Sequence, residues 1–395
     1  MGNFTFDGHK VPFEEGDTVG AALHRRGVKV LSRSLKYHRP RGLFCNQGSC
    51  GSCLVDVDGI PNTTACTALC KDGAVVRSQN RLGSARHDLF GLTDKVFWDG
   101  FDPHDAFTRP RWMNALFLRA VRFMSGLGRP PKPGTHLEGP RRHMLAVDEL
   151  VIGAGSRGIA RAITASNEGK QVLLVDEARV PGGSARWHPL EVPTRTLAAS
   201  LGKHPSITVW TGSTCFGLYP GETGPLAAIA RPGPAPDAKM PDLWEVTAKR
   251  ITLALGGHDA WPLFPNNDLP GVLSLRGAIR LLGEHGVRPG WTVVVHGERL
   301  PPGIGAWFQN AGIQVVAQGK VTEARGGVTI EAAKVNNDWV GCDTILSNLP
   351  GTPRVELYQQ AGCKLDWSRG VLGPAHDATG ATNVPGVFVA TEAHP

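Results

Sequence analysis

Four cysteines in the first seventy residues constrain the fold of this chain more than any other feature. Their spacing is C-x4-C-x2-C-x12-C, over Cys45, Cys50, Cys53 and Cys66. Three thiolates on one loop and a fourth farther along the chain are typical of plant-type [2Fe–2S] ligation. The spacing therefore predicts an N-terminal domain that holds a [2Fe–2S] cluster and transfers electrons.

The loop sequence CNQGSCGSC supports this interpretation. Gly48 and Gly51 allow a tight backbone turn, in which amide N–H groups point at the sulfurs. Zinc is the main alternative, but zinc ribbons usually present two separated C-x2-C pairs and this region has one. Nothing indicates secretion, so a disulfide framework is not expected. Cys70 is either an alternative ligand or a buried free thiol. The other cysteines are interpreted as core or surface thiols: Cys215, Cys342 and Cys363.

A length of 395 residues predicts two or three domains. The formal charge is +7, but the chain has no long Lys/Arg run and no aromatic residues along a basic stripe, so we expect no nucleic-acid partner. The N-terminus lacks the apolar region of a secretory signal, and no apolar run approaches a membrane-spanning length. The expected location is the cytoplasm, where thiolate ligands stay reduced.

The first 94 residues carry the pattern of a small β-grasp domain. Residues 3–13 predict a hairpin, and Asp17 or Thr18 is the expected N-cap of the following helix. Alternating residues at 54–58 and an apolar stretch at 74–76 predict two further strands.

Residues 95–145 are expected to form a linker arm with one short helix, at 112–124. Proline-rich stretches bound this segment, and Arg119 and Arg122 lie on the polar side of the helix. A basic amphipathic helix can lie on a membrane surface. Packing against a neighbouring domain or subunit is the favoured interpretation, because the helix is short and single.

A second pattern begins at Val147: strand, glycine-rich loop, helix, strand. The loop at 153–158 is G-x-G-x-x-G, and Asp176 follows the second strand. This context indicates a dinucleotide-binding unit, in which the glycines allow close approach of the pyrophosphate and the helix N-terminus stabilises its charge. Asp176 would accept a hydrogen bond from the ribose. No arginine immediately follows the acid, so a 2′-phosphate is not favoured.

A related unit lies at 291–316. Strands are expected at 291–295 and 313–316, but the intervening segment at 297–303 lacks Gly-x-Gly and contains two prolines. We therefore expect a Rossmann-like subdomain whose dinucleotide site is degraded or reshaped, and NAD is not an expected cofactor.

Several longer segments are distinctive: LKYHRPRGLFC at 35–45, PNTTAC at 61–66, KDGAVVRSQN at 71–80, VIGAGSRGIARA at 151–162, VLLVDEARVPGG at 172–183, ITLALGGHDAWPLFPNNDLPGV at 251–272 and NVPGVFVATEA at 383–393. Through them nearly the whole chain resembles the α subunits of heteromeric sarcosine oxidases. It also resembles their relatives in hydrogen cyanide synthase, opine oxidase and dye-linked proline or hydroxyproline dehydrogenases.

The resemblance implies an α/β fold with an α+β N-terminal domain: a ferredoxin-like β-grasp domain, then a flavoprotein with two Rossmann-like dinucleotide-binding domains. The expected boundaries are 1–94 for the cluster domain, 95–145 for the linker, 146–256 and 350–395 for the FAD domain, and 257–349 for the inserted second domain. The resemblance also implies a flavoprotein β subunit that oxidises an amine or imino acid. It leaves room for FMN at a subunit interface and for small additional subunits.

The residues expected to bind FAD come from the glycine-rich segments, the acids after the second strand and the segments that close the site. They are Gly153, Gly155, Ser156, Arg157, Gly158, Asp176, Glu177, Gly182, Gly183, Gly256 and Glu392. No catalytic residue is predicted, because no Ser/His/Asp or Cys/His set can be assembled. His258 and Asp259 are accordingly given no acid–base role.

The chain departs from the family pattern at three points. It has Ala254-Leu255-Gly256-Gly257 where the family commonly has Ala-Thr-Gly, and Ala390-Thr391-Glu392 where the family commonly has Ala-Gly-Asp. It also stops at Pro395, before the helix that follows in the family. On this basis we expect a partly open FAD site, either covered by a partner subunit or weakened in flavin binding.

Two other functions stay open at this point. One is an NAD(P)H-dependent iron–sulfur flavoprotein reductase, against which the segment at 297–303 argues. The other is a scaffold subunit that keeps the cluster and has lost FAD, an idea favoured by Thr391-Glu392. The favoured interpretation is an electron-transfer subunit that pairs a flavin with a one-electron cluster.

Overall fold

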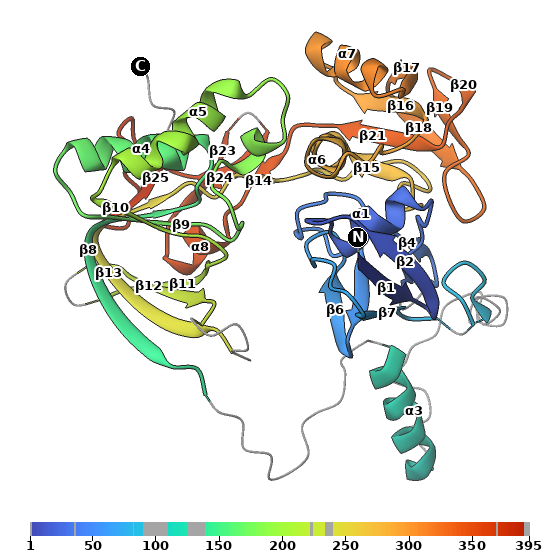
Figure 1. Cartoon of the computed structure of the whole chain (residues 1–395), viewed down its shortest axis with the longest axis horizontal. Coiled ribbons are helices and arrows are strands. Elements are labelled where there is room, and N and C mark those ends of the chain that lie inside the picture. Colours follow the sequence, from blue (N-terminus) through green and yellow to red (C-terminus); the bar gives the residue numbers. More distant parts are fainter. Residues whose placement is uncertain are drawn as a thin grey trace. The chain divides into compact units, whose positions relative to one another are not determined.

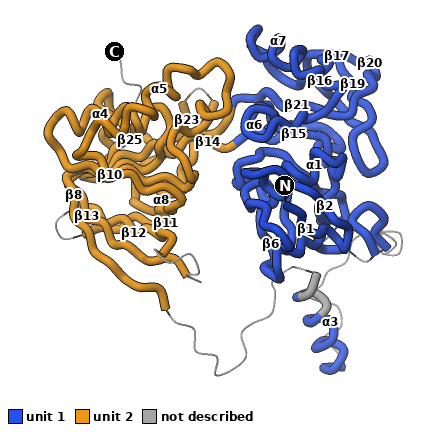
Figure 2. The backbone as a smooth tube through the Cα atoms, in the orientation of Figure 1, with its two compact units in different colours: residues 1–133, 259–350 blue, residues 134–258, 351–395 orange. Residues whose placement is uncertain are grey.

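The computed structural model describes residues 2–34, 37–81, 83–89, 110–124, 139–221, 224–233, 240–368 and 370–390 (Figure 1). The chain forms two compact units, and each is assembled from two separate stretches of sequence (Figure 2). Unit 1 contains residues 1–133 and 259–350, and unit 2 contains residues 134–258 and 351–395.

The N-terminal part of unit 1 is a five-stranded sheet in the order β2-β1-β7-β5-β6. Strands β1 and β2 form an antiparallel hairpin, and β1 pairs in parallel with β7. Helix α1 begins after Thr18, whose hydroxyl accepts a hydrogen bond from the Ala21 amide at 3.2 Å. The elements are β1 Gly2–Phe6, β2 His9–Phe13, α1 Val19–Arg25, β5 Leu54–Val57, β6 Ile60–Thr64 and β7 Val75–Ser78.

The predicted hairpin, capped helix and two strands of this domain are confirmed. Strand β6 was not predicted, because its sequence IPNTT does not alternate and it lies at the edge of the sheet. The two-residue strands β3 (Ser32–Arg33) and β4 (Pro40–Arg41) are too short to leave a periodic signal.

The second part of unit 1 contains a four-stranded parallel sheet in the order β15-β21-β16-β17. The strands expected at 291–295 and 313–316 are β16 and β17. A three-stranded antiparallel sheet, β18-β19-β20, follows β17 in the chain. The elements are β15 Val272–Ser274, α6 Leu275–His285, β16 Thr292–Gly297, α7 Pro302–Asn310, β17 Gln314–Gly319, β18 Val321–Arg325, β19 Ala332–Val335, β20 Asp338–Gly341 and β21 Thr344–Asn348.

Unit 2 is built on one sheet in the order β10-β9-β8-β13-β12-β11, with β25 added beside β13. Strands β10, β9, β8, β13 and β25 are parallel, so their carboxyl ends meet at one edge, where nucleotide-binding loops of such sheets lie. The main elements are β8 Arg142–Ile152, α4 Ser156–Asn167, β9 Val172–Val175, α5 Val192–Ser200, β10 Ile207–Trp210, β11 Thr214–Tyr219, β12 Leu226–Arg231, β13 Asp242–Leu253 and β25 Val387–Val389.

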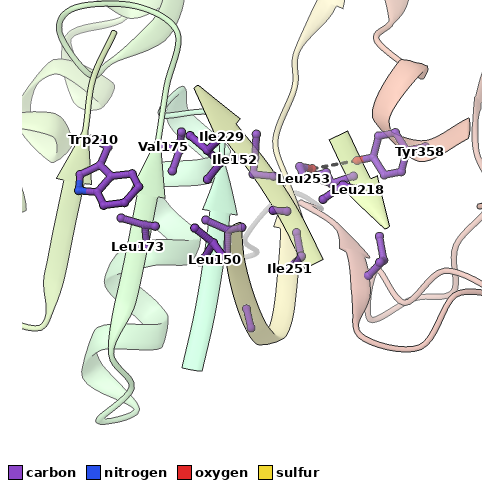
Figure 3. Packing of buried hydrophobic residues seen from close by; sticks show 14 of the residues in the cluster. Leu150, Ile152, Leu173, Val175, Trp210, Leu218, Ile229, Ile251, Leu253 and Tyr358 are labelled. Carbon is purple, nitrogen blue, oxygen red and sulfur yellow. Dashed lines mark hydrogen bonds between the residues drawn. The ribbon is translucent and has the colours of Figure 1, made fainter. Parts of the chain in front are cut away.

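Shorter elements complete unit 2: β14 (Gly257–His258) pairs with β22 (Thr352–Pro353), and β23 (Leu365–Ser368) pairs with β24 (Val371–Pro374). Helix α8 (Glu356–Gln360) contributes Tyr358 to the core, where the phenol donates a hydrogen bond to the Leu253 carbonyl at 2.9 Å (Figure 3). This bond joins the C-terminal stretch to β13. The surrounding cluster is apolar and includes Leu150, Leu173, Leu218, Ile229 and Ile251.

Helix α3 (Arg111–Met124) confirms the helix predicted at 112–124. Trp112, Leu116 and Leu118 are exposed on it. The rest of the predicted linker, apart from residues 110 and 139–145, lies outside the described residues. Among the described helices, none has the length and apolar character needed to cross a membrane.

Candidate cofactor sites

The four cysteine thiols of the N-terminal domain come together in the structure. Cys45, Cys53 and Cys66 are buried, and Cys50 is partly buried. The sulfurs of Cys45 and Cys50 are within hydrogen-bonding range, as are those of Cys53 and Cys66, and Cys45 also reaches Cys66. Four thiols that converge in this way suit a two-iron cluster held by four thiolates.

Backbone and hydroxyl donors point at these sulfurs. The Gln47 amide lies 3.4 Å from the Cys45 sulfur, and the Gly48 amide lies 3.3 Å from the Cys66 sulfur. The loop reaches this geometry through left-handed backbone conformations at Asn46 and at Gly48, with φ of 52° and 79°. The donor role expected for the tight loop is therefore confirmed at Gly48, and the sulfur environment fits an anionic cluster.

Hydrogen bonds within this group of thiols shift their pKa values in opposite directions. Hydrogen bonds from Cys50 and Cys66 lower the pKa of Cys45, and a hydrogen bond from Cys66 lowers the pKa of Cys53. The donating thiols, Cys50 and Cys66, have raised pKa values. Burial raises the pKa of Cys70 to about 12.

The donor set can also be compared with a single-ion site. Within the described ranges, no three or more His, Cys, Asp or Glu side chains are arranged around one metal-ion position. The four thiols lie in one connected series, Cys50–Cys45–Cys66–Cys53. Four converging thiols with amide donors aimed at sulfur fit a [2Fe–2S] cluster.

The glycine loop that begins unit 2 has the shape of a dinucleotide cradle. Gly153 has φ of 102°, and a Cβ there would lie 2.2 Å from the Ala254 carbonyl oxygen. A Cβ at Gly158 would lie 1.8 Å from the Gly153 oxygen. At Gly155, by contrast, a Cβ would meet no atom within 4 Å. The first and third glycines are thus needed for the fold of the loop, whereas the middle one faces open space.

A second glycine pair closes on this loop. The Gly182 amide donates to the Ala154 carbonyl at 2.7 Å, and a Cβ at Gly183 would lie 2.9 Å from the Gly155 Cα. No side chain caps the start of α4, and Ser156 is exposed there. Arg157 is also exposed. The structure therefore brings the two predicted glycine segments together around an uncapped helix N-terminus, which suits a pyrophosphate.

A buried ion pair fixes the orientation of α4. Glu149 of β8 is fully buried, and its carboxylate accepts two hydrogen bonds from Arg161, at 2.7 and 2.6 Å. Thr252 of β13 donates a third at 2.9 Å. One carboxylate therefore joins α4 to two strands of the sheet and holds the helix start at the glycine loop.

The two acids after β9 have different surroundings. The carboxylate of Asp176 accepts hydrogen bonds from the Ala154 and Ala178 amides, and burial raises its pKa. This side chain shapes the glycine loop from within. Glu177 is exposed, and its carboxylate lies 2.9 Å from Arg354 Nη1. Glu177 is thus the more accessible partner for a ribose hydroxyl.

Arg354 was missed by the sequence analysis, because it lies 177 positions after its partner and matches no motif. Its amide donates to the Gly256 carbonyl at 3.1 Å, and Gly256 has φ of 69° with open space at its Cβ. Gly256 therefore lies beside the same acid–arginine pair. Glu392, the remaining residue expected to bind FAD, lies outside the described residues.

The second glycine-bearing loop, after β16, is occupied by its own chain. The Glu298 amide donates to the Asn348 carbonyl at 3.0 Å, and the Leu300 amide donates to the Gln318 side chain at 3.1 Å. The Asn348 side chain donates to the Glu298 and Arg299 carbonyls. Pro301 and Pro302 at the start of α7 carry no N–H. This loop therefore has few free amides for a pyrophosphate.

Comparison with known proteins adds three results. A model of the 2Fe-2S iron-sulfur cluster binding domain matches residues 2–81. Sarcosine oxidase subunit alpha of Rhizobium meliloti (strain 1021) is 33% identical over 312 residues, which is 74% of this chain and 31% of that protein. Its counterpart in Corynebacterium sp. (strain U-96) is 28% identical over 397 residues, 94% of this chain and 35% of that protein.

A further relative matches a short part of the chain. Hydrogen cyanide synthase subunit HcnA of Pseudomonas aeruginosa is 32% identical over 74 residues, covering 19% of this chain and 70% of that subunit. The chain thus covers most of HcnA but only about a third of the sarcosine oxidase alpha subunits that it matches.

Among solved structures, L-proline dehydrogenase from P. horikoshii matches with a TM-score of 0.71 and 22% identity, over 98% of this chain and 68% of that chain. This likeness confirms the expected fold: a ferredoxin-like [2Fe–2S] domain followed by a Rossmann-type flavoprotein fold.

Proposed function

Because the chain belongs to the sarcosine oxidase alpha subunit-like proteins with an N-terminal [2Fe–2S] domain, we propose that it is the electron-transfer subunit of a heteromeric oxidoreductase. Its partner would be a flavoprotein β subunit that oxidises the CH–NH bond of an amine or imino acid. Small additional subunits and an FMN at a subunit interface are part of this proposal. It draws on the relatives, which are named as sarcosine oxidase and hydrogen cyanide synthase subunits.

One observation carries the proposal. A single chain combines four converging thiols with N–H donors aimed at sulfur and an accessible dinucleotide cradle. The ligands of the cluster would be Cys45, Cys50, Cys53 and Cys66. A flavin takes up two electrons and releases them singly, so a flavin and a one-electron cluster together match a two-electron oxidation to a one-electron acceptor.

The proposed dinucleotide is FAD. Backbone amides at the start of α4, near Gly155, Ser156 and Arg157, would bind the pyrophosphate. Glu177 would bind the ribose, while Asp176 holds the loop that both contacts need. Gly182 and Gly183 would hold the second glycine segment against the first loop, and Gly256, with open space at its Cβ, would allow the backbone to approach the ligand closely.

The NAD(P)H-dependent reductase is not favoured. Such an enzyme would need a second dinucleotide site, and the loop after β16 has two prolines and amides that already bond within the chain. The domain boundaries at 1–94, 146–256 with 350–395, and 257–349 are retained as part of the proposal.

The proposal can be tested on the complex isolated anaerobically with its own subunits. We expect sarcosine or L-proline, supplied separately, to produce the low-temperature electron paramagnetic resonance signal of a reduced [2Fe–2S] cluster. The isolated chain should show no such signal with either compound. Reduction of the cluster in the isolated chain by NADH or NADPH would contradict the proposal and favour the reductase.

A further inference from the structure

The subdomain at 259–350 contacts the cysteine loop through helix α6, which lies in the same compact unit (Figure 2). The Ser274 amide donates to the Phe44 carbonyl at 3.1 Å. Arg280 Nη1 donates to the Asn46 carbonyl at 2.6 Å, and the Asn46 side chain donates to the Gly277 carbonyl at 2.9 Å. The backbone on both sides of Cys45 is therefore bonded to α6.

Asp259 adds a side-chain hydrogen bond to Gln47, the residue that follows Asn46 in the loop. Its carboxylate accepts hydrogen bonds from Gln47 Nε2 at 3.0 Å and from the Ser274 hydroxyl at 2.9 Å. Arg276 Nε donates to the other oxygen at 2.8 Å. Asp259 thus joins the cysteine loop to the N-cap of α6, and Arg276 fixes the orientation of its carboxylate.

The approach of α6 to the loop depends on a glycine. A Cβ at Gly277 would lie 2.5 Å from the Phe44 oxygen and 2.9 Å from the Cys45 oxygen, both of which are backbone atoms. Beside this contact the Phe44 and Trp261 rings stack, with centroids 3.7 Å apart and planes at 8°. The loop and the subdomain therefore pack at backbone distance.

We propose that α6 and Asp259 are positioning elements for the cluster: they hold residues 44–47 so that the Gln47 and Gly48 amides point at the sulfurs of Cys45 and Cys66. Donors to sulfur stabilise the more negative, reduced cluster and so raise its reduction potential. In this role the subdomain keeps a nucleotide-binding topology but acts on the iron–sulfur site. The inference rests on the proposed cluster ligation.

The bonds by which α6 and Asp259 hold residues 44–47 are called the clamp below. Three variants weaken the clamp in different ways. Gln47→Leu removes the bond to Asp259 without changing charge. Gly277→Ala crowds the loop backbone, although alanine is the better helix former by about 1 kcal/mol. Arg280→Gln removes the bond to Asn46, the ion pair with Glu284 and one positive charge.

The matched control is Lys29→Gln. Lys29 donates to the Asp343 carbonyl of the same subdomain at 2.8 Å, so this variant also removes one positive charge and one bond to a backbone carbonyl. It leaves the bonds of residues 44–47 in place.

In the full-length chain we expect Gln47→Leu, Gly277→Ala and Arg280→Gln to lower the reduction potential of the cluster. Loss of an outer-sphere partner typically weakens metal retention by about 10- to 100-fold, so iron release to a chelator should be about tenfold faster. Lys29→Gln should match the wild type in both measurements, and unchanged thermal unfolding would verify that each variant is folded.

Wild-type potential and iron release in folded Gln47→Leu and Gly277→Ala would overturn the inference, and so would an equal change in Lys29→Gln. A second readout separates this failure from failure of the proposed function. In the iron-free chain, amide hydrogens at 46–48 should exchange faster in Gln47→Leu than in Lys29→Gln. A wild-type chain without iron would contradict the ligand assignment, whereas equal exchange in the two variants would contradict the clamp.

Discussion

The loops at 153–158 and 297–303 occupy the same place in two β-strand–loop–helix units, yet they differ in the space and the free amide N–H groups that they offer to a phosphate. The first loop has open space at Gly155 and an uncapped helix start. In the second, Asn348 and Gln318 bond the loop, and prolines replace two amides. A nucleotide-binding topology can thus occur with a loop that offers few free amides to a phosphate.

The two subdomains that contain these loops, unit 2 (the first subdomain) and residues 259–350 (the second), also differ in what their first helix contacts. Helix α4 is fixed to its own sheet through Glu149 and Arg161, which presents its N-terminus at the glycine loop. Helix α6 is bonded to the cysteine loop through Gly277 and Arg280. We therefore expect changes in the first subdomain to affect dinucleotide binding and changes in the second to affect the cluster.

The largest expected effect comes from the buried carboxylate of the first subdomain. Glu149→Ala removes the buried carboxylate that pairs with Arg161, which then retains the more exposed Glu168, and breaking a buried pair typically costs about 3–5 kcal/mol. Urea denaturation should show this loss in the free energy of unfolding. A loss below about 1 kcal/mol would mean that the pair behaves as a surface salt bridge and does not fix α4.

Gly155→Ala tests the open space in the first loop directly. A methyl group fits the ligand-free structure but occupies space that the pyrophosphate needs, and overpacking of about 1–3 kcal/mol corresponds to roughly 5- to 150-fold weaker binding. FAD titration followed by fluorescence would measure the change. Gly305→Ala in α7, where a Cβ also meets open space, should leave FAD binding unchanged. Equal weakening of FAD binding by both substitutions would contradict the proposed difference between the two loops.

His24 tests the contact between the cluster domain and the second subdomain. Its Nε2 lies 3.0 Å from the Pro289 carbonyl, and burial, with Lys29 nearby, lowers its pKa from 6.5 to about 4. The unfolded chain then binds more protons between these pKa values, so stability is present above pH 6.5 and is lost as the pH falls toward 4.

Between pH 7 and pH 5 this loss should be about 2 kcal/mol. Urea denaturation at the two pH values, for the wild type and His24→Gln, would measure it. The variant should lose less stability over this interval. An identical loss in both proteins would show that His24 does not stay neutral in the folded chain.

The smallest expected effect concerns the exposed acid. Glu177→Gln removes a surface ion pair with Arg354, which contributes at most about 1 kcal/mol to stability. Loss of a charged hydrogen-bond partner to the ribose should nevertheless weaken FAD binding by about tenfold. Calorimetry would measure the affinity, and unchanged affinity would contradict the role proposed for Glu177.

The elements that sequence reasoning found are those with local signals. The Thr18 cap, the helix at α3, and the glycine turns at Gly153 and Gly48 follow from neighbouring residues, and the structure confirms them. Strand β6 has no alternation to detect.

The contacts that sequence reasoning missed join distant positions. Gln47 meets Asp259 from 212 residues away, and Arg280 meets Asn46 from 234 residues away. Helix α6 shows an ordinary amphipathic pattern, and nothing in it indicates that Gly277 packs on a cysteine loop. Such pairings depend on how the subdomains of unit 1 fold together, so periodicity and motif spacing cannot specify them.

The most direct test of this account is a cofactor inventory of the isolated chain, purified anaerobically, with iron, acid-labile sulfide, zinc and released dinucleotide measured per chain. The account predicts two irons, two sulfides and one FAD, since the cysteine loop and the first glycine loop each hold one cofactor and the second glycine loop holds none. Zinc in place of iron would contradict the cluster assignment. Two dinucleotides per chain would contradict the difference between the two loops.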